Sequence, residues 1–275
     1  MASNDGVIVI LGTGGTIAGV ASSATDNVGY SAAQLSIQAL VAAVPPLATL
    51  PIEAEQVAQL DSKDMTHAVW LALVQRVEAH LARAEVAGVV VAHGTDTLEE
   101  TAYFLHRVLA PEKPVVLTAA MRPATSLQSD GPQNLLDAVT VAREPGAQGA
   151  VAVLAGAVHA GADVRKAHGY RLDAFDSGDA GPIARVTEGR VRLLRPWPVG
   201  VALGLHALPA DVAAWPRVDI VTSHAGADGS IVDALVASGA RGIVVAGTGS
   251  GTVHGAIETA LERARRAGVA VARAT

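Results

Sequence analysis

The sequence contains no cysteine, and aromatic residues make up only 3% of its 275 residues. The absence of cysteine excludes disulfide bonds, thiolate metal sites and a cysteine nucleophile. The shortage of aromatic rings argues against a stacking platform for nucleic-acid bases, and no apolar run approaches the roughly 18 residues that a membrane-spanning helix requires. The net charge is −6, and the 20 basic residues form no long basic stripe. We therefore expect a small-molecule partner and neither a nucleic-acid nor a membrane partner.

Signals for targeting and for metal binding are also missing. The first ten residues, "MASNDGVIVI", lack the basic start, apolar core and cleavage site of a secretion signal. We therefore expect the protein in the cytoplasm by default, or in the periplasm if a signal peptide has been removed. The nine histidines are scattered, and neither an HExxH zinc motif nor a GxSxG serine motif occurs. We expect an activity that uses no metal and no cofactor.

Short β-branched runs alternate with helical patterns along the chain. Nearly unbroken apolar runs are typical of parallel strands buried on both faces, and their alternation with helices indicates an α/β protein. The predicted strands are residues 6–11, 87–92, 113–119, 149–156, 218–223 and 241–247. The predicted helices are residues 32–44, 65–84, 98–109, 134–143, 231–237 and 254–266.

One segment interrupts this alternation. Residues 190–216 contain four prolines and no sustained helical period, which predicts an edge strand followed by a linker. We predict a larger N-terminal parallel-sheet domain over residues 1–195, a linker over 196–215 and a smaller C-terminal α/β domain over 216–275. The last nine residues, "AGVAVARAT", have the pattern of a strand, and a domain that stops on a strand is expected to be truncated.

The segment "GTGGTIAG", residues 12–19, follows the first strand directly. Glycine at a strand exit can adopt positive φ and lets the backbone approach a ligand closely. The segment lacks the lysine of a phosphate loop, and Ile17 stands where a dinucleotide motif needs its third glycine. Two hydroxyl groups, on Thr13 and Thr16, remain as candidate reactive groups at the carboxyl end of a strand. A glycine-rich turn without chemistry is the alternative.

A second strand exit carries "HGTDTLEETAYFL", residues 93–105. Thr97 and Glu100 have the spacing of a capping box at the start of a helix, which gives Thr97 a structural role. Thr95 and Asp96 are left as candidate site residues, although aspartate is also a favoured helix cap.

A third strand exit carries "AAMRPATSLQSDGPQNL", residues 119–135. Pro132 suits the first turn of a helix, and we interpret Asp130 as the cap of that helix. Lys166, in "GADVRKAHGY", is by its sequence context alone a solvated surface lysine.

The three exit segments, in this order and at these separations, resemble the bacterial-type L-asparaginases of the asparaginase/glutaminase family, type II-like. The resemblance extends weakly through almost the whole chain. It implies a cofactor-free hydrolysis of the side-chain amide of L-asparagine to L-aspartate and ammonia. It also implies a two-domain α/β fold assembled as a homotetramer, a dimer of dimers with active sites between subunits.

The resemblance implies catalytic roles for five residues. Thr16 matches the family's nucleophile, which forms an acyl-enzyme, and Tyr30 matches its partner on a mobile flap. Thr95, Asp96 and Lys166 match a second group, in which the lysine activates the threonine. A hydroxyl nucleophile needs such a proton acceptor, and a lysine can act as one only if burial or neighbours lower its pKa.

The resemblance also implies the substrate contacts. Ser62 matches the residue that binds the substrate carboxylate, and Asp96 is a suitable partner for the substrate ammonium. Backbone N–H groups of Gly15, Gly94 and Ala120 complete the predicted binding positions, the last two near the reacting carbonyl oxygen.

Three departures from the family pattern stand out. Lys63 occupies a predicted substrate-binding position where the family commonly has glutamine or glutamate. Ser250 and Thr252 stand where many members have asparagines that support a neighbouring subunit's site. Family members also continue for several dozen residues beyond this chain, with an acidic residue for that same site.

Other functions remain open at this point. A glutaminase-asparaginase of broader specificity is the first alternative. A non-catalytic amino-acid-binding protein on the same fold is the second, motivated by Lys63 and the missing tail. A nucleotide-binding protein is the third.

Overall fold

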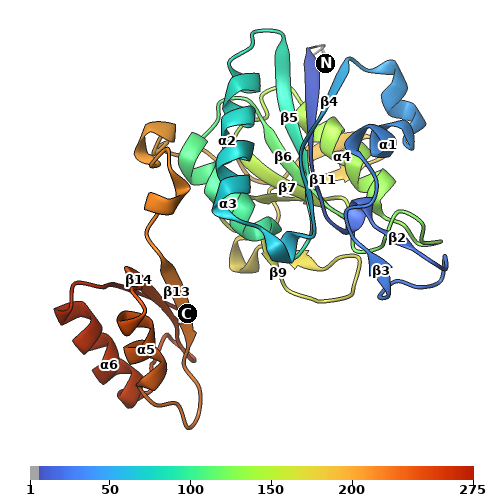
Figure 1. Cartoon of the computed structure of the whole chain (residues 1–275). Helices are drawn as coiled ribbons and strands as arrows, with labels where there is room; N and C mark the ends of the chain where they lie inside the picture. The colour runs from blue at the N-terminus through green and yellow to red at the C-terminus, as the bar shows by residue number, and fades with distance from the viewer. Residues whose placement is uncertain (1–5) are drawn as a thin grey trace. The chain divides into compact units, whose positions relative to one another are not determined.

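The computed structural model describes residues 6–275, which divide into two compact units, one up to Leu208 and one from Pro209 (Figure 1). The larger unit contains α1 (Ile37–Ala42), α2 (His67–Leu81), α3 (Leu98–Leu109) and α4 (Gly131–Ala142). Its strands are β1 (Val7–Gly14), β2 (Val20–Ala21), β3 (Tyr30–Ser31), β4 (Ile52–Leu60), β5 (Val86–Ala92), β6 (Val115–Thr118), β7 (Ala150–Leu154), β8 (Ala157–Ala160), β9 (Arg165–Lys166), β10 (Phe175–Asp176), β11 (Ala184–Thr187) and β12 (Arg190–Leu193).

Eight of these strands form one sheet in the order β12-β11-β8-β7-β6-β5-β1-β4. The pairings from β4 to β7 are parallel, and those from β7 to β12 are antiparallel. This mixed sheet with helical connections confirms the predicted α/β class. The carboxyl ends of the parallel strands meet at one end of the sheet, where open α/β folds bind their ligands.

The residues of β1 alternate between two hydrophobic cores. Ile8 and Ile10 belong to the core that contains residues of α1 and α4, and Val9 and Leu11 belong to the core that contains residues of α2 and α3. Figure 1 shows these two pairs of helices on opposite sides of the sheet. All four side chains are fully buried, and each burial stabilises the fold by about 1.5–3 kcal/mol. β1 is thereby fixed on both faces, and so is the loop at its end.

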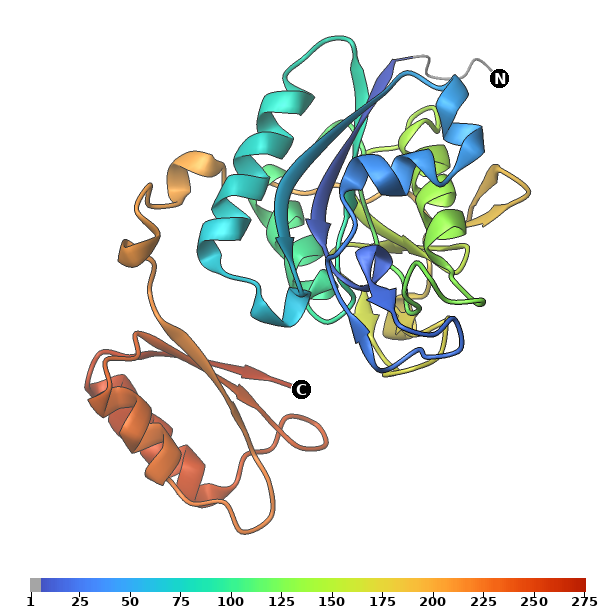
Figure 2. The ribbon, with the colours of Figure 1, turned by 45° about the vertical axis from the view of Figure 1, so that its right-hand side comes forward.

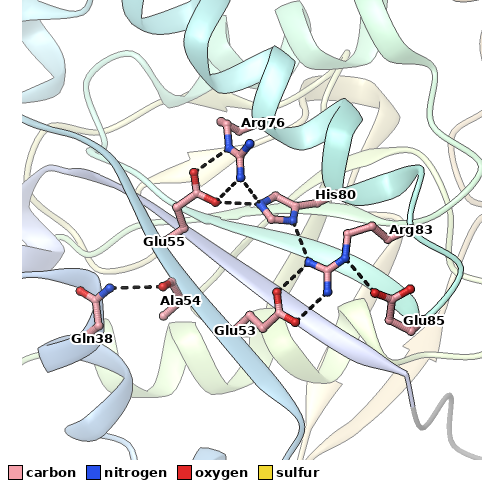
Figure 3. Close-up of polar contacts among 8 residues, drawn as sticks. All are labelled: Gln38, Glu53, Ala54, Glu55, Arg76, His80, Arg83 and Glu85. Atoms are coloured by element: carbon pink, nitrogen blue, oxygen red, sulfur yellow. Dashed lines mark hydrogen bonds and ion pairs between the residues drawn. The ribbon is translucent and has the colours of Figure 1, made fainter.

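The edge strand β4 differs from β1, because charged side chains lie along it (Figure 3). Glu55 accepts hydrogen bonds from Arg76 at 2.6 and 2.7 Å and from His80 at 2.8 Å. Glu53 accepts two from Arg83, both at 2.7 Å. Charged side chains along an outer strand oppose the addition of a further strand.

The smaller unit consists of β13 (Val218–Thr222), α5 (Ser230–Ala237), β14 (Gly242–Ala246), α6 (Gly255–Arg266) and β15 (Ala270–Ala274). Its three strands are parallel, in the order β13-β14-β15. Residues of both helices and all three strands contribute to one core (Figure 2).

The helix predicted over residues 32–44 is shorter in the structure. α1 begins only at Ile37, after Ser36 caps its first turn by accepting from the Ala39 N–H. Upstream, Tyr30 and Ser31 form β3, and Ala33 has φ of +55°. A left-handed residue interrupts a right-handed helix, so the apolar period of residues 32–35 does not continue α1.

Candidate active site

The exit of β1 places a threonine hydroxyl against a tyrosine hydroxyl. Gly14 and Gly15 have φ of +106° and +83°, so the chain leaves the sheet in a conformation that favours glycine. The β2–β3 hairpin then brings Tyr30 back to Thr16. The Thr16 Oγ1 and Tyr30 hydroxyl oxygens lie 2.6 Å apart, and Thr16 is only 8% exposed. Either hydroxyl can donate, so this hydrogen bond offers a route for a proton away from Thr16.

The exit of β5 and strand β9 bring together the second predicted group. The Lys166 ammonium donates to Thr95 Oγ1 at 2.9 Å and to Asp96 Oδ1 at 2.6 Å. Thr95 is buried, whereas the Asp96 side chain is 49% exposed. A lysine and a threonine therefore contact each other beside a carboxylate that remains accessible to a ligand.

Glu99 has a role at this site that the sequence did not reveal. It lies in the first turn of α3, and its carboxylate accepts a hydrogen bond from the backbone N–H of Lys166. The start of α3 thus holds both the backbone of Lys166, through Glu99, and its ammonium, through Asp96. The only sequence signal for this role was the position of Glu99 inside "HGTDTLEE". The capping-box spacing in that segment indicated Glu100 rather than Glu99.

The capping-box prediction for Thr97 is wrong. Thr97 occupies the N-cap position of α3, but its side chain makes no capping hydrogen bond. Its hydroxyl donates to the Ser62 carbonyl oxygen at 2.9 Å, and Ser62 Oγ accepts from the Asp96 N–H at 3.1 Å. These two bonds join the loop after β4 to the loop after β5, so the buried Ser62 lies beside Asp96.

Lys63 is placed differently from the other predicted binding residues. Its side chain is 60% exposed, and its ammonium lies 2.7 Å from Asp61 Oδ2 and 3.3 Å from Asp64 Oδ2. Hydrogen bonds to these two carboxylates raise the pKa of Lys63. The positive charge added at this position is therefore balanced locally by two flanking acids.

Two glycines allow the loops after β1 and β5 to touch. A Cβ atom on Gly15 would lie 2.3 Å from Gly94 Cα, and one on Gly94 would lie 2.4 Å from Ser62 Oγ. Carbon atoms in contact normally stay about 3.5–4.0 Å apart. Because Gly15 adjoins Thr16 and Gly94 adjoins Thr95, this close approach brings the two predicted threonines to the same end of the sheet.

The exit of β6 is held by Asp130. Its carboxylate accepts from the N–H groups of Met121 and Arg122, both at 3.0 Å. Asp130 stands at the N-cap position of α4, as predicted, but its side chain does not cap the helix. Ala120 is fully buried in this loop, and Gly131 lies close to both Ala120 and Ile17.

A buried histidine stabilises the loop that carries Thr95. His93 is fully buried, with Nδ1 2.7 Å from Gly94 O and Nε2 3.0 Å from Thr101 Oγ1. Trp70 Nε1 donates to the same Thr101 hydroxyl at 2.8 Å. The Thr101 hydroxyl in turn donates its proton to His93 Nε2. The proton of the His93 ring is then on Nδ1, which donates to Gly94 O. Burial lowers the pKa of His93 to about 4, and the neutral ring satisfies this chain of bonds.

The described part of the chain, residues 6–275, contains no cluster of three or more histidine, aspartate or glutamate side chains suited to a metal ion. Within the same residues, no helix has the length and apolar character needed to cross a membrane.

Comparisons with known proteins identify relatives over nearly the whole chain. Residues 7–198 match the family model described as asparaginase, N-terminal, and residues 217–275 match that of the glutaminase/asparaginase C-terminal domain. L-asparaginase 2 of Escherichia coli (strain K12) is 37% identical over 274 residues, which cover 98% of this chain and 77% of that protein. The glutaminase-asparaginase of Pseudomonas fluorescens biotype A is 35% identical over 276 residues, which cover 98% and 75%. The crystal structure of a probable cytoplasmic L-asparaginase from Campylobacter jejuni superimposes with a TM-score of 0.91 at 35% identity, covering 97% of this chain and 82% of that one.

Proposed function

The chain belongs to the asparaginase family, and on that premise we propose that it hydrolyses the side-chain amide of L-asparagine to L-aspartate and ammonia. The observation that carries this proposal is the close approach of two loops at one end of the sheet, each of which carries a threonine hydroxyl. Thr16 with its tyrosine partner and Thr95 with its lysine partner are joined through the Gly15–Gly94 contact. Two hydroxyl groups with proton-transfer partners suit acyl transfer from an amide to water.

Thr16 is the proposed nucleophile. As its Oγ1 bonds to the amide carbon, its proton passes to the Tyr30 hydroxyl oxygen, and the Tyr30 proton passes to the leaving nitrogen, so the tyrosine ends unchanged. Ammonia departs and leaves an acyl ester on Thr16. A water molecule then attacks this ester. Its proton passes to the Thr95 hydroxyl oxygen of the Thr95–Lys166 pair, and one proton is returned to the departing Thr16 Oγ1, so aspartate and the free threonine are released and the pair ends unchanged.

Asp96 and Ser62 are the proposed anchors for the α-ammonium and the α-carboxylate of the substrate. The Asp96 carboxylate is half exposed and bonds Lys166 through Oδ1, which leaves Oδ2 for an ammonium group. Among the hydrogen bonds of residues 6–275, Ser62 Oγ only accepts, from the Asp96 N–H. Its own proton can therefore be donated to a carboxylate. A carboxylate for the ammonium and a hydroxyl donor for the carboxylate orient a single amide toward Thr16.

Glutamine is the second candidate substrate, because one of the relatives is named a glutaminase-asparaginase. Lys63 is the position at which we expect the two amides to be distinguished, since it adds a charge next to the carboxylate anchor Ser62. We also propose that the chain assembles as the homotetramer implied by the resemblance and that it is located in the cytoplasm.

The test measures ammonia release from L-asparagine, L-glutamine and D-asparagine by the purified chain, with its mass in solution determined on the same sample. We expect turnover of L-asparagine by a tetramer. Thr16→Ala should lower kcat by more than about 10³-fold, because the covalent intermediate is lost. Thr25→Ala, which removes an exposed hydroxyl from the turn between β2 and β3, is the matched control. Substantial activity in Thr16→Ala would exclude the nucleophile assignment, and no ammonia from any of the three amides would exclude the function.

A further inference from the structure

A polar cavity of about 400 Å³ is lined by residues other than the proposed catalytic ones, although one lining residue, Ala167, directly follows Lys166 in the chain. This volume falls within the range of small-molecule pockets. Its walls come from β8, β11 and residues 167–182, and none of the five predicted catalytic residues lines it. The charged and titratable side chains in its lining belong to His159, His168, Arg171, Asp173, Asp176 and Arg185.

His159 is the buried polar group of this cavity. It is only 3% exposed, and its Nδ1 lies 2.8 Å from Ser177 Oγ. Its Nε2 has no hydrogen-bond partner in the described part of the chain. Burial and the nearby positive charge of Arg185 lower the pKa of His159 to about 4, so the ring is neutral. When the Ser177 hydroxyl donates to Nδ1, the proton resides on Nε2, which is then a buried donor without an acceptor.

Two arginines lie on the same face of the sheet as His159. Arg185 of β11 stands opposite Ala157 of β8, and side chains alternate along a strand, so His159 shares this face. Arg185 also stands opposite Arg192 of β12. Like charges directly opposite each other destabilise a sheet. Neither guanidinium makes a hydrogen bond or ion pair within residues 6–275.

The two acids of the cavity are already engaged by other groups. Asp176 accepts from Arg165 Nε at 2.7 Å and from the Gly178 N–H at 3.1 Å. Asp173 accepts from Arg171 Nε at 2.9 Å. Arg185, an exposed residue at this cavity, is therefore the charged side chain of the lining to which residues 6–275 supply no counter-ion.

We propose that this cavity binds the oxyanion of a small molecule, a carboxylate or a phosphate, between the Arg185 guanidinium and the His159 Nε2–H. The planar guanidinium presents paired donors that match either oxyanion. Arg192, opposite Arg185 in the strand pair, adds a second positive charge next to it. The site is independent of the proposed amidohydrolase activity.

The proposal is tested by isothermal titration calorimetry of the full chain with inorganic phosphate and, separately, with malonate, at an ionic strength held constant with sodium chloride. Arg185→Gln removes the charge, and His159→Asn removes Nε2 while keeping a polar atom near Ser177. Arg241→Gln, at an exposed arginine of the smaller unit, makes the same charge change and is the matched control.

We expect saturable binding that Arg185→Gln weakens about tenfold to hundredfold, the effect of one charge-assisted hydrogen-bonded pair, and that Arg241→Gln leaves unchanged. Tighter binding of phosphate than of malonate would identify a phosphate ester as the ligand class, and the reverse order would identify a carboxylate. Malonate bound at the asparagine site would be insensitive to Arg185. Absence of saturable binding, or binding that survives Arg185→Gln with equal affinity, would overturn the proposal. If Arg185→Gln does not fold, unaltered binding by His159→Asn and Arg192→Gln overturns it.

Discussion

Replacement of Gly15 by alanine should disable the enzyme while leaving it folded. Gly15 has φ of 83° and ψ of −171°, a backbone region essentially restricted to glycine. The added Cβ would lie 2.3 Å from Gly94 Cα, 2.5 Å from Gly94 N and 2.9 Å from the His93 carbonyl carbon. All three are backbone atoms, so no side-chain rotation can relieve the contacts. The loop that carries Thr16 and the loop that carries Thr95 must separate.

The size of the effect follows from these distances. The backbone conformation costs an alanine about 1–3 kcal/mol, and overpacking costs about 1–3 kcal/mol more. A normal carbon contact requires the two loops to move apart by about 1 Å or more. Misplacement of reacting groups by about 1 Å can lower the rate about 100-fold. We therefore expect Gly15→Ala to lose about 2–6 kcal/mol of stability and at least about 100-fold in kcat.

Gly146→Ala is the matched control, because Gly146 also has positive φ, 76°, but a Cβ atom added to it would meet no other atom within 4 Å. Urea denaturation and steady-state ammonia release are measured for both variants. The control should lose about 1 kcal/mol and keep its activity. If Gly15→Ala and Gly146→Ala behave alike in both assays, the close approach of the two loops does not position the threonines, and the reasoning fails.

Three further predictions concern other parts of the larger unit. Lys166→Met should lower kcat about 10²–10⁴-fold by removing the donor to Thr95 without unfolding the chain; steady-state kinetics within threefold of the unsubstituted protein would contradict this role. The folded-state pKa of His93, about 4, lies below its unfolded value of 6.5, so the stabilisation is complete above pH 6.5 and is lost as the pH falls toward 4. His93 should contribute up to about 3 kcal/mol to the loss of stability over this window in urea unfolding, beside the contribution of His159, whose pKa is also lowered to about 4. The fall should therefore be smaller in His93→Asn, and an equal fall in that variant would assign the whole loss to other groups. Glu55→Gln should lower stability by about 1–2 kcal/mol, because Arg76 loses its charged partner, with kcat unchanged; a changed kcat would show that the edge of the sheet influences the active site.

The strands buried on both faces could be predicted from apolar runs alone. The predicted strand over residues 87–92 corresponds to β5 (Val86–Ala92), which is buried throughout. The final strand expected over 267–275 corresponds to β15 (Ala270–Ala274), although that strand is mostly exposed. β4 was missed because its sequence, "IEAEQVAQL", mixes polar with apolar residues, and its first four residues alternate as in a strand with one solvated face. That alternation was the available signal, and the prediction relied on unbroken apolar runs.

The site could be predicted in parts but not as an assembly. Each segment that follows a strand contains its own candidate hydroxyl or acid, which the sequence alone indicates. The contact between Gly15 and Gly94, however, depends on β1 and β5 being neighbours in the sheet. Strand order is a tertiary property that local periodicity does not contain. For the same reason Thr97 donates to Ser62 rather than capping its helix, because a partner from a distant loop competes with the local bond.

The place of β1 between β4 and β5 also affects how the chain is made. Both partners follow β1 in sequence, and β5 ends only at Ala92, roughly 80 residues after β1 has left the ribosome. At synthesis rates of about 5–20 residues per second, an apolar strand waits about 4–16 seconds until both neighbours of its two edges have been made. Open edges pair readily with other chains. The strand that precedes the proposed nucleophile therefore needs protection from aggregation before its neighbours have been translated.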